Sequence, residues 1–209
     1  MTDTRPVLLR KARWLAAFTV AWNVIEGVLA IGFGVADESV ALLGFGLDSW
    51  VEVGAASMVL WRLQGGDDRK RQKRATAVIG VLLLVLAVST IAASVLTLVS
   101  GGRPETTVTG AIIAGVSLSF MFALWRAKAR LAEALDDTTL RADAACSRGC
   151  LELSAVLLAG SLLFVLVPSL WWADAVAALG LAALIGREGV GALAASRRPE
   201  PTSGCGCSH

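Results

Sequence analysis

Two pairs of residues with metal-binding side chains stand out in the chain, and the members of each pair lie four positions apart. Asp48 and Glu52 lie in the apolar segment ALLGFGLDSWVEVGAAS, and Cys146 and Cys150 lie in RADAACSRGCLELS. Positions i and i+4 share one face of an α-helix, so both side chains of a pair can point at one ion. Two carboxylates and two thiolates can form a tetrahedral site, which suits zinc or a softer ion better than magnesium or calcium. The pattern predicts a heavy-metal site.

Each pair also has a purely structural alternative. Cysteine is a comfortable small apolar residue in a helix, and a buried protonated acid can hold two helices together through a hydrogen bond. If Asp48 and Glu52 share an ion, two negative charges this close resist joint ionisation. A cation that binds would then displace protons, from sulfur as well as from carboxyl groups. We therefore expect protons as the counter-ion of metal binding.

Other ionisable residues in the apolar segments need a role, because burying a charge in a membrane is costly. Asn23 and Glu26 share one helix face in AWNVIEG and could support the ion site or relay protons; alternatively, Glu26 fastens the first two spans together. Asp143 could guard the entrance to the site. Arg148, between the two cysteines, needs a partner: either Glu152 at i+4, or the carboxylates of the empty site.

The last residues, SGCGCSH, place Cys205, Cys207 and His209 close together. Two thiols with a nearby imidazole can capture a soft metal ion, although an inert tail is the alternative. The segment is rich in Gly, Ser, Pro and Arg, so residues 191–209 are predicted to be a disordered cytoplasmic tail.

The composition indicates a membrane protein. Of the 209 residues, 56% are hydrophobic and only 17% are charged, and the mean hydropathy is +0.68. These values lie outside the range of soluble domains. We predict an all-α, polytopic membrane protein with about six transmembrane helices of about twenty residues each. The predicted spans are 14–35, 39–61, 75–99, 107–125, 144–167 and 170–186, so that 1–13 form a cytoplasmic N-terminus and 14–190 the transport domain.

The distribution of Lys and Arg predicts the orientation. Basic residues precede the first span, fill the segment 67–74, DDRKRQKR, and continue as Arg126, Lys128 and Arg130 in the predicted fourth loop. Cytoplasmic loops carry this excess of positive charge, so both termini are predicted to be cytoplasmic. The net charge of +2 gives no indication of a nucleic-acid partner. Membrane lipid is the expected environment, and we expect the bacterial inner (plasma) membrane.

Four motifs carry a resemblance to a known family: WNVIEG, SVALLGFGLDSWVEV with a following WRL, RADAACSRGC, and WWADAVAAL with REG. Over roughly residues 8–195 the chain resembles the cation diffusion facilitator (cation efflux) superfamily, particularly its small six-helix members without a cytoplasmic C-terminal domain. In that superfamily, helices two and five each contribute an i, i+4 pair of Asp or His to a central zinc site. The resemblance implies that Asp48 and Glu52 occupy the helix-two positions, while Cys146 and Cys150 stand where His or Asp is common. A homodimer is expected.

The residues and the resemblance together predict a divalent heavy-metal transporter that exports its ion, with zinc as the leading candidate, from the cytoplasm by proton antiport. One alternative is a carrier for softer ions such as cadmium, mercury or copper(I). Another is a membrane metal sensor or modulator that binds ions without moving them. An enzyme is not expected, because the chain shows no arrangement of nucleophile and base and no phosphate-binding loop.

Overall fold

The computed structural model describes residues 4–36, 40–65, 68–101 and 108–197, which form long helices. In chain order the elements are α1 (Thr4–Ala36), α2 (Val40–Gln64), α3 (Arg69–Ser100), α4 (Val108–Leu135), α5 (Thr138–Leu166), the short 3-10 turn η1 (Pro168–Leu170) and α6 (Ala173–Arg197). No strand occurs in these residues. The predicted all-α fold is therefore confirmed.

Five of the helices, α1, α2, α3, α5 and α6, each contain a stretch long and apolar enough to cross a membrane. The remaining long helix, α4, runs alongside them and carries Arg126, Lys128 and Arg130 in its second half. The helices extend beyond the predicted spans at their polar ends: α1 begins at Thr4 and α4 continues to Leu135. Lys, Arg, Glu and Ala are good helix formers, so helical structure does not stop where apolar sequence does.

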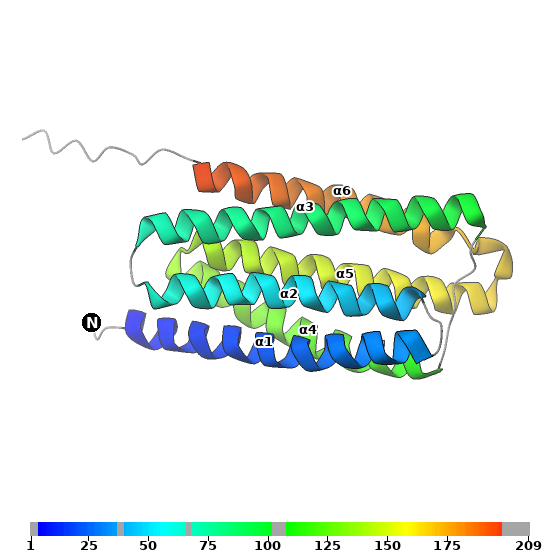
Figure 1. Ribbon diagram of the computed structural model, residues 1–209, viewed down its shortest axis with the longest axis horizontal. Helices are drawn as coiled ribbons and strands as arrows, with labels where there is room; N and C mark the ends of the chain where they lie inside the picture. Colours follow the sequence, from blue (N-terminus) through cyan, green and yellow to red (C-terminus); the bar gives the residue numbers. More distant parts are fainter. Residues whose placement is uncertain (1–3, 37–39, 66–67, 102–107, 198–209) are drawn as a thin grey trace, which may run out of the picture.

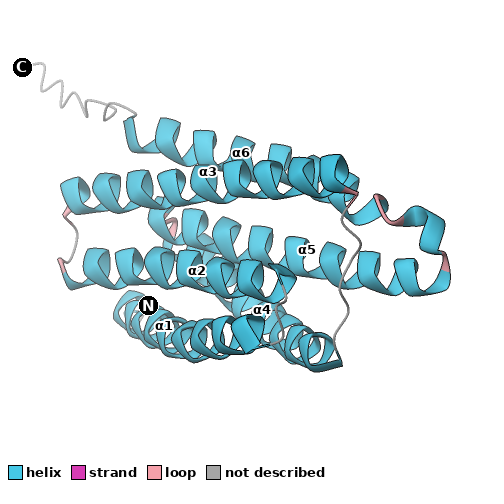
Figure 2. Ribbon diagram, turned by 45° about the vertical axis from the view of Figure 1, so that its right-hand side comes forward, coloured by secondary structure: helices cyan, strands magenta, loops and turns pink. Residues whose placement is uncertain are grey.

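The helices form one elongated bundle with α5 in its middle (Figure 1). The most extensive packing is between α1 and α2 and between α3 and α6, and α5 contacts α2, α3, α4 and α6. The starts of α1, α3 and α5 and the ends of α2, α4 and α6 all lie at one end of the bundle (Figures 1 and 2). The basic segments thus share one end, which the positive-inside rule assigns to the cytoplasm.

Two aspartates fix the bundle at the end that carries these basic segments. Asp68 caps α3 by accepting hydrogen bonds from the backbone N–H groups of Lys70 and Arg71. Asp137 caps α5 in the same way and also pairs with the buried Arg62 of α2, with 2.6 Å between Arg62 Nη2 and Asp137 Oδ2. Capping removes unsatisfied donors, and the buried ion pair ties the start of α5 to the end of α2. The relative positions of these two helices are therefore well defined.

Glycine allows the backbones of α3 and α6 to approach closely. A Cβ atom built on Gly189 would lie 3.0 Å from the carbonyl oxygen of Gly80, and one built on Gly80 would lie 3.0 Å from the oxygen of Gly189. Small residues at such crossings are typical of helix packing in membranes, where association depends on close van der Waals contact.

We expect Gly189→Val to lower the free energy of unfolding by about 1–3 kcal/mol, because the side chain would force α3 and α6 apart. Thermal unfolding of the purified protein in detergent measures this as a lower midpoint temperature. Gly191→Val is the matched control, since a Cβ atom there meets nothing within 4 Å. Equal losses in both variants would mean that the α3–α6 crossing is not the cause.

Candidate metal site

The four residues predicted to bind metal lie together where α2 packs against α5. The ligand atoms of Glu52, Cys146 and Cys150 all lie within 4.8 Å of one another, and all three side chains are completely buried. Asp48, one turn from Glu52 on α2, accepts a hydrogen bond from the Cys150 thiol, with 3.0 Å between Cys150 Sγ and Asp48 Oδ1. We refer to these four residues as the α2–α5 cluster.

The cluster forms because the two helices run antiparallel with their paired faces toward each other. At 1.5 Å per residue, Glu52 and Cys150 each lie about 18 Å along their helices from the end of the bundle that carries the basic segments. The sequence left open whether the cysteines lie deep enough to meet the carboxylates, because Arg141 is only a few positions before Cys146. In the structure α5 already begins at Thr138, so Arg141 belongs to the helix and the cysteines reach the level of the α2 carboxylates.

The chemistry of the cluster fits a small divalent ion. Zinc binds sulfur at about 2.3 Å and carboxylate oxygen at about 2.0–2.2 Å, so ligand atoms within 4.8 Å of one another can close on one ion with small side-chain movements. Glu52 Oε1 is buried and has no hydrogen-bond partner among the described residues. A buried acceptor without a partner is unusual and is available to a cation or a proton.

A buried lysine, Lys128 of α4, lies against the cluster. Its side chain is only 2% exposed, and its ammonium group donates to Glu52 Oε2 and Asp143 Oδ1 at 3.0 Å each and to Ser147 Oγ at 2.7 Å. The sequence prediction that placed Lys128 in a cytoplasmic loop was wrong, because α4 continues to Leu135 and carries the side chain into the bundle.

The burial of Lys128 can be recognised from the spacing of apolar and polar residues in the sequence. Ser117, Met121, Leu124 and Lys128 follow one another at intervals of four, three and four residues, which is the spacing of one helix face. All four are buried. The prediction grouped Lys128 with Arg126 and Arg130 as basic residues of one loop. Arg126 and Arg130 lie on a different side of the helix from Lys128, and both are exposed.

Asp143, considered as a residue guarding the entrance, is 1% exposed and lies beside the cluster through its ion pair with Lys128. Ser147, one turn further along α5, is also buried and donates to the Asp143 backbone carbonyl. The structure therefore adds one acidic and one hydroxyl side chain to the surroundings of Glu52.

Asn23 and Glu26 of α1 are both buried. The Ser117 hydroxyl of α4 donates to Glu26 Oε1, so Glu26 connects α1 with α4 and not with α2 as the structural alternative assumed. Asn23 donates to the Thr19 carbonyl at 2.9 Å. Asn23 Oδ1 and Glu26 Oε2 have no hydrogen-bond partner in the described part of the chain. A supporting or proton-relay role for these two residues stays a prediction.

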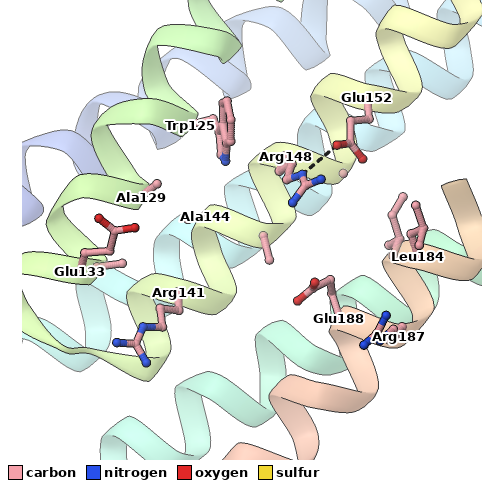
Figure 3. Close-up of a pocket in the computed structure, with 14 residues that line it drawn as sticks. Trp125, Ala129, Glu133, Arg141, Ala144, Arg148, Glu152, Leu184, Arg187 and Glu188 are labelled. Carbon is pink, nitrogen blue, oxygen red and sulfur yellow. Dashed lines mark hydrogen bonds and ion pairs between the residues drawn. The ribbon is translucent and has the colours of Figure 1, made fainter.

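Arg148 points away from the cluster, since a residue two positions from Cys146 lies on the other side of the helix. Arg148 Nε pairs with Glu152 Oε1 at 2.7 Å, so the predicted i, i+4 pairing is confirmed. Both side chains line a groove between α4, α5 and α6, together with Glu188 and Arg187 of α6 (Figure 3). The positive charge next to Glu52 is that of Lys128.

The tail residues Cys205, Cys207 and His209 lie outside the described residues. Their predicted capture of a soft metal ion stays a prediction.

Comparison with known proteins agrees with this architecture. The family model of the cation efflux transmembrane domain matches residues 71–198, more than half of the chain. The matched region contains α5 with Cys146 and Cys150 and α4 with Lys128, whereas the α2 carboxylates lie before it. A search of curated proteins found no match. The chain belongs to the cation efflux family of membrane proteins.

Proposed function

We propose that this protein carries divalent heavy-metal ions across the membrane through the α2–α5 cluster, with zinc as the leading ion. Membership of the cation efflux family supports transport of divalent cations in general. The observation that carries the specific proposal is that Glu52, Cys146 and Cys150 converge within 4.8 Å in the buried interior of a membrane bundle. Carboxylates at this depth are costly to bury, and binding a cation compensates that cost.

The cysteines determine which ions the site should accept. Thiolates are soft ligands that favour zinc, cadmium and still softer ions, whereas magnesium and calcium require oxygen ligands. Because of the two buried cysteines, the second candidate function is a carrier for cadmium, mercury or copper(I). The ratio of zinc to cadmium transport separates the two candidates.

Binding should be coupled to proton release. Cysteine must lose its proton to bind a metal ion, and so must any protonated carboxyl group in the cluster. A metal ion that leaves on the opposite side allows the same groups to take up protons there. This exchange supports proton antiport, with metal exported from the cytoplasm. We further expect a homodimer in a bacterial inner membrane.

The test is metal flux into proteoliposomes that contain the purified protein. Zinc, cadmium and mercury are each offered with and without a proton gradient, and protein-free liposomes provide the control. We expect uptake of zinc and cadmium that accelerates when the lumen is more acidic than the outside. Metal binding without flux would favour the non-transporting sensor, and the absence of both binding and flux would refute the assignment.

A further inference from the structure

We propose that Lys128 acts as a built-in counter-cation of the metal site. Its ammonium group forms an ion pair with Glu52 in the absence of metal, and this ion pair must break when the metal ion binds. The inference rests on the proposed transport function and concerns its specificity. It assigns to α4 a direct part in the binding step, in addition to the parts of α2 and α5.

The three contacts of Lys128 account for all the donors of its ammonium group. An ammonium group has three N–H donors and no acceptor, and here they reach Glu52, Asp143 and Ser147 at 3.0, 3.0 and 2.7 Å. A lysine with 2% exposure needs this compensation, because an unpaired charge in the interior is very costly. The protein therefore supplies its own positive charge next to Glu52.

Two carboxylates surround this single ammonium group, and they come from different helices. Glu52 belongs to α2 and is part of the α2–α5 cluster, whereas Asp143 belongs to α5 and lies next to Ser147. Lys128 can thus release Glu52 and keep both its ion pair with Asp143 and its hydrogen bond to Ser147. Asp143 and Ser147 can therefore continue to stabilise the ammonium group after a metal ion has replaced it at Glu52.

A divalent ion and the ammonium group cannot share Glu52 without a large repulsion. The free Glu52 Oε1 is the atom available to a metal ion, and an ion bound there would still lie within a few ångströms of Lys128 Nζ, which is 3.0 Å from Glu52 Oε2. Like charges at such a distance repel strongly where water is excluded. Metal binding must therefore work against Lys128, which lowers the affinity for the ion and favours its release.

The competing explanation is that Lys128 only holds α2, α4 and α5 together. The chain offers a matched comparison in the ion pair of Arg62 with Asp137, which is also buried and also joins α2 to α5. Removing a pair that is only structural can change the stability of the protein but should not raise its affinity for metal. A counter-cation predicts a gain instead, because its removal leaves Glu52 free for the metal ion.

The experiment measures Zn²⁺ and Cd²⁺ affinity of the purified protein in lipid nanodiscs. The variant is Lys128→Met with Asp143→Asn, which removes one positive and one negative charge together, so that the net charge of the group is unchanged and Glu52 loses its competing cation. We expect the dissociation constant of both ions to fall by roughly 5- to 150-fold, the usual range of coupling between competing groups. The control, Arg62→Met with Asp137→Asn, removes a buried ion pair away from Glu52, keeps a capping side chain at α5 and should show no gain in affinity.

Lys128→Arg keeps the charge and should show no gain in affinity. Unchanged or weaker binding in the folded Lys128→Met/Asp143→Asn protein, or a gain in Lys128→Arg, would overturn the inference. If the double variant does not fold, a structure of the wild-type protein loaded with Cd²⁺ decides: the inference requires that Lys128 Nζ has left hydrogen-bonding distance of Glu52. A wild-type protein that binds neither ion would refute the proposed function itself, whereas wild-type binding with an unchanged variant refutes only the role of Lys128.

Discussion

Asp48→Asn is expected to reduce zinc flux into proteoliposomes by at least about 100-fold, the upper end of what loss of a mere supporting group at a metal site costs. The substitution replaces a carboxylate by a neutral amide of the same size, so it removes a ligand without leaving a void. Asp48 also accepts the hydrogen bond of the Cys150 thiol, 3.0 Å from its Oδ1, and so positions one of the sulfurs. Both effects lower metal affinity.

The matched control is Glu188→Gln, which removes a carboxylate of the same bundle from the groove on the other side of α5 (Figure 3). This variant should transport zinc at the wild-type rate. Size-exclusion chromatography and thermal unfolding should give the same profile for Asp48→Asn as for the wild type. Undiminished zinc flux in Asp48→Asn would show that the transported ion does not pass through the α2–α5 cluster.

The Cys146→Ser/Cys150→Ser variant is expected to lose cadmium transport by at least about 10-fold more than zinc transport, a difference of about 1.4 kcal/mol. Serine keeps the approximate size of cysteine but scarcely ionises, and a hydroxyl binds soft metals poorly. X-ray absorption of zinc-loaded protein should show sulfur at about 2.3 Å from the metal in the wild type and only oxygen in the variant. Competing zinc and cadmium uptake in the same proteoliposomes measures the change in selectivity.

Cys205→Ser/Cys207→Ser makes the same chemical change at the two tail cysteines and serves as the control. Its ratio of zinc to cadmium flux should equal that of the wild type at saturating metal. If the Cys146→Ser/Cys150→Ser variant instead kept the wild-type ratio, and no sulfur were found near the metal in the parent protein, the two buried cysteines would be packing residues. Asp143 would then be the first α5 side chain to test as a ligand.

The two substitutions probe different properties of one site. In the proposed site Asp48 is one of the anionic ligands that compensate the charge of a divalent ion, whereas the cysteines supply soft ligands, which select among divalent ions. Loss of Asp48 should therefore lower the flux of every ion, whereas loss of the two sulfur ligands should change which ion is transported fastest. A uniform loss in both variants would indicate general damage to the bundle.

The sequence alone determined the helical membrane fold and the residues of the α2–α5 cluster. Apolar stretches long enough to span a membrane are predicted to be helices, because a helix satisfies every backbone hydrogen bond within the segment. The i, i+4 spacing of Asp48 with Glu52 and of Cys146 with Cys150 places each pair on one face of its helix, which is a local property of the chain. Which side chains share one face of a helix therefore follows from their spacing in the sequence.

Only the tertiary structure decided how these faces meet and which other side chains join them. The depth of Cys146 depends on where α5 begins and on the Arg62–Asp137 ion pair that ties it to α2, and neither follows from hydropathy. The charge of Lys128 looked like part of a cytoplasmic loop, because composition does not tell which side of a helix a residue occupies. The packing of α4 against α1 and α5 turned that charge inward, next to Glu52, where two buried carboxylates compensate the buried ammonium group.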